Sequence, residues 1–108
     1  MMWIALESEE QLTAIKSRSF EQPVVIFKHS TRCSTSSMVK SRLERSEVPK
    51  GFDFYYLDLI RYRSVSNRIA EMFGVEHESP QVLVIRDGKC VYDESHMAIR
   101  MEELTEMS

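Results

Sequence analysis

The sequence predicts an α/β fold in which a mixed central sheet of four to five strands is covered by helices on both faces. Bounded apolar runs rich in β-branched or aromatic residues alternate with stretches of helical periodicity along most of the chain. The first strand–helix–strand unit implies a parallel, right-handed crossover. Asp87-Gly88, between two strand-like runs, predicts an antiparallel hairpin late in the chain. The expected order is β-α-β-α-β-α-β-β-α.

Strands are expected at the short apolar or aromatic runs, which are residues 3–6, 24–27, 52–59, 81–86 and 89–93. Helices are expected at residues 8–19, 33–46, 64–74 and 98–107. Ser8 and Gln11 resemble a capping box at the start of the first helix, and Ser64 is placed to cap the third. Gly74 is placed to end that third helix.

The composition restricts the class of protein. The chain has 108 residues, which we interpret as a single domain spanning residues 1–108. Its formal net charge of −3 argues against binding to nucleic acid or to an anionic membrane. It contains neither the roughly 20 apolar residues that span a bilayer nor a secretion signal. Two widely separated cysteines are too few for a disulfide framework or a cysteine-based zinc site, so a reducing cytoplasm is the expected location.

The candidate nucleophile is Cys33, which follows the apolar strand at 24–27 and precedes a predicted helix. The unpaired N–H groups and the positive dipole end of a helix favour a thiolate at this place, and the neighbouring Arg32 adds positive charge. A lone cysteine is more often a packing residue, but the polar sequence on both sides argues against burial. We therefore expect a reactive thiol.

Two other classes of cysteine enzyme have motifs that can be compared with this sequence. A phosphatase-like Cys-x5-Arg loop would need an arginine at position 39, where this chain has Val39. A papain-like Cys–His pair would need a general base, and no local signature supports one for the three histidines. His77 precedes Pro80 and is expected near Cys33, where a histidine would favour the thiolate.

Other side chains are expected to be structural. The arginines Arg42 and Arg45 are interpreted as part of a solvated face, and Lys28 as a solubilising charge or a contribution to the field at the thiol. Met38 is expected to face inward on its helix, and the methionines in general are interpreted as core residues. These side chains are not expected to form a metal site.

The order of elements is similar to the thioredoxin fold. In that fold the reactive cysteine begins the helix after the central strand, beside a cis-proline that precedes the hairpin; here these are Cys33 and Pro80. The position of a second, resolving cysteine is taken by Ser36, whose hydroxyl can hydrogen-bond a thiolate but cannot form a disulfide. The implied chemistry is monothiol exchange, which needs an outside thiol. Cys90 is the one internal alternative, and it is expected to be buried and inert.

Several blocks of the chain resemble the monothiol bacilliredoxins of the bacillithiol system. The resemblance extends from about residue 24 to residue 99. It is carried by Lys28-His29-Ser30-Thr31-x-Cys33-x-x-Ser36, Ser66-Asn67-x-Ile69-Ala70-Glu71-x-x-Gly74-Val75-x-His77-Glu78-Ser79-Pro80-Gln81, Asp87-Gly88 and Ser95-His96-x-x-Ile99.

The resemblance implies that Cys33 removes bacillithiol from mixed disulfides on client proteins. A second bacillithiol would release the adduct as a symmetrical disulfide, which a flavin disulfide reductase recycles. No tightly bound cofactor is implied; bacillithiol or a similar small thiol is a co-substrate. The residues expected to contact substrate are Arg32, Ser34, Ser36, His77, Ser79 and Pro80.

The chain departs from the family pattern in having Arg32-Cys33-Ser34 where Thr-Cys-Pro is common. The identity of the small thiol therefore stays open. Two other functions also stay open: a non-catalytic thioredoxin-like scaffold, and a dithiol enzyme that uses Cys33 with Cys90.

Overall fold

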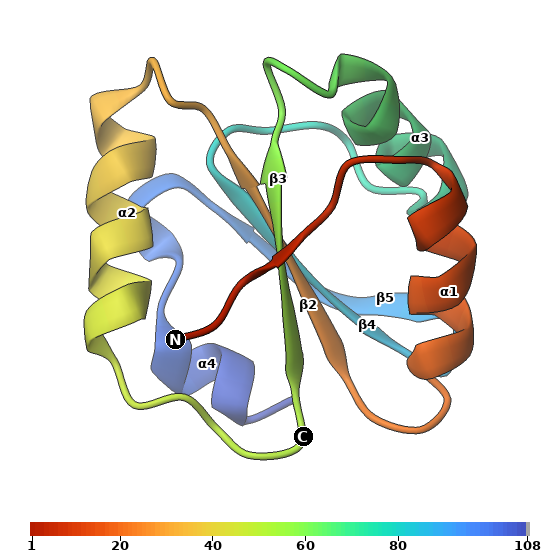
Figure 1. Ribbon diagram of the computed structural model, residues 1–108. Helices are drawn as coiled ribbons and strands as arrows, with labels where there is room; N and C mark the ends of the chain where they lie inside the picture. The colour runs from red at the N-terminus through yellow and green to blue at the C-terminus, as the bar shows by residue number, and fades with distance from the viewer. Residues whose placement is uncertain (108) are drawn as a thin grey trace.

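A computed structural model describes residues 1–107, and its centre is a mixed five-stranded sheet with the strand order β1-β3-β2-β4-β5 (Figure 1). The strands are β1 (Ile4–Ala5), β2 (Val24–His29), β3 (Asp53–Asp58), β4 (Gln81–Arg86) and β5 (Lys89–Ser95). The helices are α1 (Glu10–Arg18), α2 (Ser34–Arg45), α3 (Arg63–Phe73), the 3₁₀ turn η1 (His96–Ala98) and α4 (Met101–Thr105). The predicted α/β, thioredoxin-like architecture is confirmed.

The direction of the strands follows from their connections. β1, β3 and β2 are parallel and are joined through helices, whereas β4 is antiparallel to β2 and β5 is antiparallel to β4. The β4–β5 turn is the predicted hairpin, with Asp87 and Gly88 at φ values of 53° and 76°. Gly88 also needs to be glycine for space, because a Cβ atom there would lie 2.9 Å from the Phe20 ring.

The central strand β2 is buried on both faces, which explains the continuous apolar sequence of its residues 24–27. Val24 and Ile26 face a core shared with α1 and α3. Val25 and Phe27 face a second core shared with α2 and α4. Because side chains alternate along a strand, Lys28 continues the first face and His29 the second. This alternation divides the polar residues near the site into two groups.

The starts of α1 and α3 differ from expectation. α1 begins at Glu10 with Glu9, not Ser8, in the capping position. α3 begins at Arg63 with Tyr62 in the capping position, so Ser64 lies inside the first turn rather than at the cap. The carbonyl of Asp58 accepts the Tyr62 N–H at 2.9 Å and its carboxylate accepts the Arg61 N–H, which starts the turn early.

The last predicted helix is interrupted, and β5 extends to Ser95 rather than Asp93. η1 ends at Ala98, and α4 begins at Met101 after the extended residues Ile99 and Arg100. Ile99 is fully buried in the core beneath α2, and its carbonyl accepts a hydrogen bond from Arg42. Burying Ile99 in an extended conformation separates the two helical pieces.

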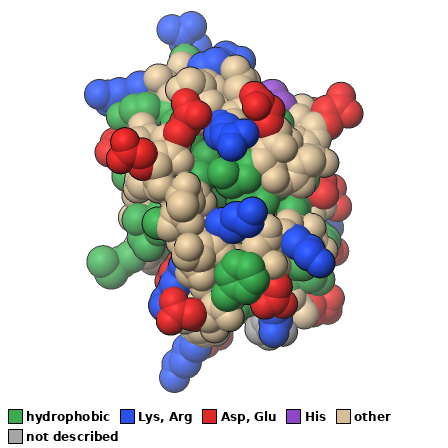
Figure 2. All heavy atoms as spheres, turned by 90° about the vertical axis from the view of Figure 1, so that its right-hand side faces the viewer, with side chains coloured by type: hydrophobic (Ala, Val, Ile, Leu, Met, Phe, Trp, Pro, Cys, Tyr) green, Lys and Arg blue, Asp and Glu red, His purple; other side chains and the backbone are tan. Residues whose placement is uncertain are grey.

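The face formed by α1 and α3 carries charges of both signs, interspersed without a single-sign patch (Figure 2). Arg68 on α3, for example, lies 3.6 Å from Glu71 one turn later. In residues 1–107 no helix has both the length and the apolar character required to cross a membrane.

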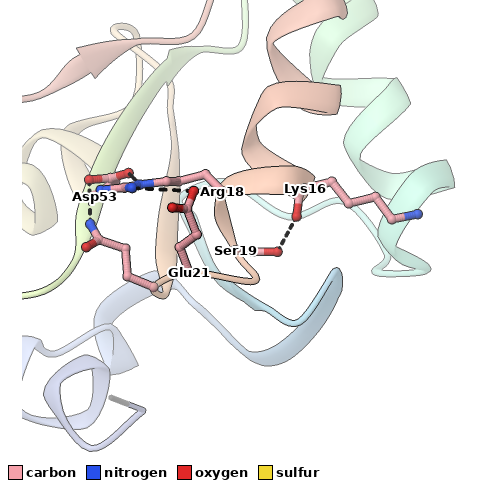
Figure 3. Close-up of polar contacts among 6 residues, drawn as sticks. Lys16, Arg18, Ser19, Glu21 and Asp53 are labelled. Carbon is pink, nitrogen blue, oxygen red and sulfur yellow. Dashed lines mark hydrogen bonds and ion pairs between the residues drawn. The ribbon is translucent and has the colours of Figure 1, made fainter.

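The lower end of the sheet in Figure 1 is fixed by polar contacts, which Figure 3 shows in detail. Arg18 Nε donates to the Asp53 carboxylate at 2.9 Å, which joins the end of α1 to the start of β3. Ser19 accepts the N–H groups of Asp87 and Gly88 at 2.9 Å each, so the hairpin turn is joined to the same end of α1. The upper end, where β2 leads into α2, carries the candidate site.

Candidate active site

Cys33 occupies the N-cap position of α2 and is partly exposed. Its backbone is extended, with φ −107° and ψ 118°. Its N–H donates to the Ser30 carbonyl at 3.2 Å, and its carbonyl accepts the Ser37 N–H at 3.1 Å. The Cys33 side chain makes no capping hydrogen bond to the helix. The thiol is therefore held at the start of a helix while its sulfur stays available to a substrate.

Ser36 lies in the first turn of α2, but its hydroxyl does not serve the role expected of it. The side chain is fully buried. Ser36 Oγ lies 2.6 Å from His29 Nδ1 and accepts the Ser30 N–H at 3.1 Å. Direct substrate contact by Ser36 was therefore a wrong expectation: its hydroxyl is used internally and ties the loop before Cys33 to the helix.

His29 supports Ser36 from beneath. It is buried and packs against the rings of Phe27 and Tyr56, with centroids 5.8 Å and 5.5 Å away. Burial, and then the charge of Lys40, lower the pKa of His29 from its ordinary value. A histidine of this kind is uncharged at neutral pH, so the His29–Ser36 contact adds no net charge beneath the site.

The Ser79–Pro80 loop lies at the same edge of the sheet as Cys33. The next residue, Gln81, pairs with Lys28 near the end of β2. The Ser79–Pro80 peptide bond is cis, and the Pro80 carbonyl accepts the His96 N–H at 2.9 Å. The Pro80 ring is buried, and Ser79 Oγ is buried without a hydrogen-bond partner. These two residues therefore shape the surface beside the thiol from within.

Arg32 and Ser34 lie on either side of Cys33 and are both exposed. The Arg32 backbone N–H donates to Ser30 Oγ at 3.3 Å, and this hydrogen bond stabilises the turn before Cys33. Ser34 is the first residue of α2. Both residues are therefore accessible, and their contact with a partner of Cys33 stays a prediction.

His77 belongs to a separate polar cluster on the α3 side of the sheet. Its Nδ1 lies 3.4 Å from Lys28 Nζ and 3.2 Å from Ser66 Oγ, and Lys28 Nζ donates to the Ser66 carbonyl at 3.4 Å. Burial, followed by the charge of Lys28, lowers the pKa of His77. The expectation that His77 contacts the substrate of Cys33 is not supported by these contacts.

Lys28 is fully buried, so its interpretation as a solubilising charge was wrong. It faces α3, and no carboxylate pairs with it among the ion pairs of residues 1–107. Burial alone lowers the pKa of its ammonium group from 10.5 to about 8. Its contact with His77 positions the start of the segment 77–80, which ends at Pro80.

Because Lys28 is buried, the free energy of unfolding of the wild-type protein should depend on pH, and Lys28→Met should remove this dependence. Below pH 8 Lys28 is charged in both the native and the unfolded state, and its desolvation destabilises the native state. Between pH 8 and 10.5 the native state has released the proton that the unfolded state still binds, so the free energy of unfolding rises with pH. We expect the stability advantage of Lys28→Met to shrink across this interval by up to about 3 kcal/mol.

Urea unfolding at pH 7, 9 and 10 measures this difference. Lys89→Met is the matched control, because Lys89 is exposed. Its stability difference from wild type should not change with pH. A pH-independent difference for Lys28→Met as well would contradict the buried, destabilised ammonium.

Cys90 lies at the opposite end of the sheet from Cys33. It pairs with Ile85 in β4, which pairs with Val24 at the start of β2, whereas Cys33 follows the end of β2. Four residues of strand separate Ile85 from the Gln81 end, which is roughly 13 Å at 3.3 Å per residue. A disulfide requires Cα atoms within about 7 Å, so the alternative of a Cys33–Cys90 dithiol enzyme is excluded in this fold.

Cys90 is also chemically unsuited to be a second nucleophile. Its Sγ donates to the Tyr92 carbonyl at 3.3 Å, and burial raises its pKa to about 11. It is half-buried rather than fully buried, but its expected inertness agrees with this environment.

Three residues near the site were not recognised from the sequence. Arg42 was assigned to a solvated face, but its Nη2 donates to the Met97 carbonyl at 2.8 Å and to the Ile99 carbonyl. Met38 was expected to face inward, and it is 59% exposed beside Cys33. Met97 is brought there by the His96–Pro80 contact. A hollow of about 640 Å³ lies at the far end of α2 around Pro49.

A partly exposed cysteine at the start of α2, beside a cis-proline loop on this sheet, defines a thioredoxin-fold thiol oxidoreductase. A thioredoxin-fold protein proposed to be an oxidoreductase matches with a TM-score of 0.80 and 29% identity, and the match covers 95% of this chain and 90% of that one. The thioredoxins of Fasciola hepatica and Malassezia sympodialis share the fold at TM-scores of 0.73, with 18% and 13% identity. Each match covers 98% of this chain, and 95% and 87% of theirs.

The sequence identifies the family within this class. Residues 4–104 match the profile of the monothiol bacilliredoxin BrxC. The chain belongs to the monothiol bacilliredoxin family, as its motifs predicted.

Proposed function

We propose that this protein removes a small thiol from mixed disulfides on client proteins by monothiol exchange at Cys33. The observation that carries the proposal is the isolation of this thiol. Cys33 is partly exposed at the start of α2, residue 36 is a buried serine, and Cys90 is at the other end of the sheet. An outside thiol must therefore complete each cycle.

The proposed cycle has two balanced exchanges. In the first, the Cys33 thiolate attacks the sulfur of the small thiol in the mixed disulfide; the new S–S bond forms as the old one breaks, and the client cysteine leaves as a thiolate. In the second, a free small-thiol thiolate attacks the adduct on Cys33, forms a symmetrical disulfide and returns Cys33 to the thiolate.

Membership in the bacilliredoxin family supports bacillithiol as the small thiol. Bacillithiol, or a similar thiol, would then be a co-substrate rather than a bound cofactor, and a flavin disulfide reductase would regenerate it from the disulfide product. Such a cycle requires a reducing compartment, for which we propose the cytoplasm. Arg32, Ser34, Ser79 and Pro80 would form the surface around the exchanging sulfurs.

Intact-mass measurement tests this proposal directly. Reduced protein is mixed with one peptide that carries either bacillithiol or glutathione on its cysteine. We expect the mass of the small thiol to appear on Cys33, faster from the bacillithiol peptide, and to disappear when free bacillithiol is added. The absence of an adduct from both peptides would overturn the exchange function. Equal rates from both would keep exchange and overturn the choice of bacillithiol.

A further inference from the structure

A groove opens beside Cys33, between α2 and η1. It encloses about 430 Å³ and is lined by Ser37, Met38, Ser41, Arg42, Arg45 and Met97. Two backbone hydrogen bonds join it to the site: Ser37 N–H to the Cys33 carbonyl at 3.1 Å, and His96 N–H to the Pro80 carbonyl at 2.9 Å. Cys33 and Pro80 do not line the groove, but Ser37 lies one helical turn after Cys33 and Met97 follows His96, so the groove runs along α2 next to the site.

The groove carries the two guanidiniums of Arg42 and Arg45, and Glu102 lines the hollow next to Arg42. Neither Arg42 nor Arg45 takes part in the ion pairs found within residues 1–107. Arg42 is held by the carbonyls of Met97 and Ile99, and its Nε is buried without a partner. In a chain of net charge −3, these two guanidiniums favour an acidic ligand.

The end of the groove nearest Cys33 is apolar. Met38 and Met97 are 59% and 45% exposed. Unbranched thioether side chains adapt to ligands of different shape, and they recur on surfaces that bind many partners. This end suits an apolar side chain rather than one fixed chemical group.

The length of the groove favours an extended chain. Arg45 lies twelve positions after Cys33 on α2, which is roughly 18 Å at 1.5 Å per residue. About five residues of extended peptide cover that length at roughly 3.3 Å each.

From these features we infer that the groove binds an acidic segment of the client protein that flanks its modified cysteine. An apolar side chain of the segment would lie on Met38 and Met97, and its carboxylates would pair with Arg42 and Arg45. The inference rests on the proposed function, because it takes protein mixed disulfides as the substrates of Cys33. Beyond that function, it specifies which segment of the client protein the enzyme recognises.

Two peptides test this selectivity. Both carry the same small thiol on cysteine; one has leucine followed by aspartate and glutamate on both flanks, and the other has asparagine and glutamine in place of the acids. We expect transfer to Cys33 to be about three- to tenfold faster from the acidic peptide. The preference should disappear at 1 M salt, where the screening length is about 3 Å.

Variants locate the preference. Arg45→Glu and Ser41→Glu each place a carboxylate in the groove and should reduce the preference to less than about twofold or reverse it. Arg68→Glu on α3 changes the net charge as Arg45→Glu does, but outside the groove, and should keep the preference. Circular dichroism and the midpoint of thermal unfolding check that each variant is folded.

The outcomes separate the two proposals. Equal rates from both peptides, with transfer occurring, would overturn the groove and leave the exchange function in place. No transfer from either peptide would overturn both. If Arg45→Glu and Ser41→Glu slow release of the adduct by free small thiol as much as they slow transfer from the acidic peptide, the groove binds the small thiol and the peptide proposal is wrong.

Discussion

We expect Cys33→Ser to abolish transfer of a small thiol from a modified client, because a serine hydroxyl cannot form the mixed disulfide that the cycle requires. The change removes only the sulfur, and residue 33 remains at the N-cap, where serine is well tolerated. The fold should therefore be retained. The adduct mass should be undetectable on the variant at times when the wild-type protein is fully modified.

Cys90→Ser is the matched control, since it removes the other sulfur, at the far end of the sheet. It should transfer at the wild-type rate. Loss of transfer in Cys90→Ser alone would contradict the assignment of Cys33 as the nucleophile. The Cys33→Ser variant also tests the scaffold alternative: a scaffold would still support its cellular role without the thiol, whereas an enzyme would not.

The largest loss of stability is expected for Phe27→Ala. The Phe27 side chain is fully buried in the core beneath α2, and its ring stacks on Trp3 and His29 at 5.7 Å and 5.8 Å between centroids. Truncating a buried phenylalanine costs about 3–5 kcal/mol, which is a large share of the 5–15 kcal/mol typical of a small domain. The midpoint of thermal unfolding should fall by at least roughly 12 °C.

Phe20→Ala provides the comparison, because it makes the same chemical change at a side chain that is 62% exposed. We expect it to cost less than about 1 kcal/mol. Urea unfolding of both variants measures the contrast. Similar losses in the two would show that the core around Phe27 is not packed as described.

Much of the fold was predictable because its elements have distinct sequence patterns. Residues 24–27 of β2 are apolar on both faces, and the Asp87-Gly88 turn has the residues that positive φ values favour. The helix ends were less predictable because tertiary contacts set them. The start of α3 depends on Asp58, and the break before α4 depends on the burial of Ile99.

The site was predictable at Cys33 and Pro80, whose positions follow from the order of the elements. The partners of the polar residues were not. Lysine is rarely buried without an opposite charge, so nothing local distinguishes Lys28 from a surface residue. Ser36 and His29 meet across a strand-to-helix turn, where sequence spacing does not indicate which side chains touch. The contact of Arg42 with Met97 joins positions 55 residues apart.

The placement of the two cysteines at opposite ends of the sheet has a consequence for how this protein responds to its surroundings. Cys33 is oxidised to a disulfide only by joining a second molecule, so its modified fraction at equilibrium follows the ratio of small-molecule disulfide to thiol. A protein that closes an internal disulfide follows the ratio of disulfide to the square of the thiol concentration. Diluting the whole pool would oxidise such a protein, but it would leave the state of Cys33 unchanged.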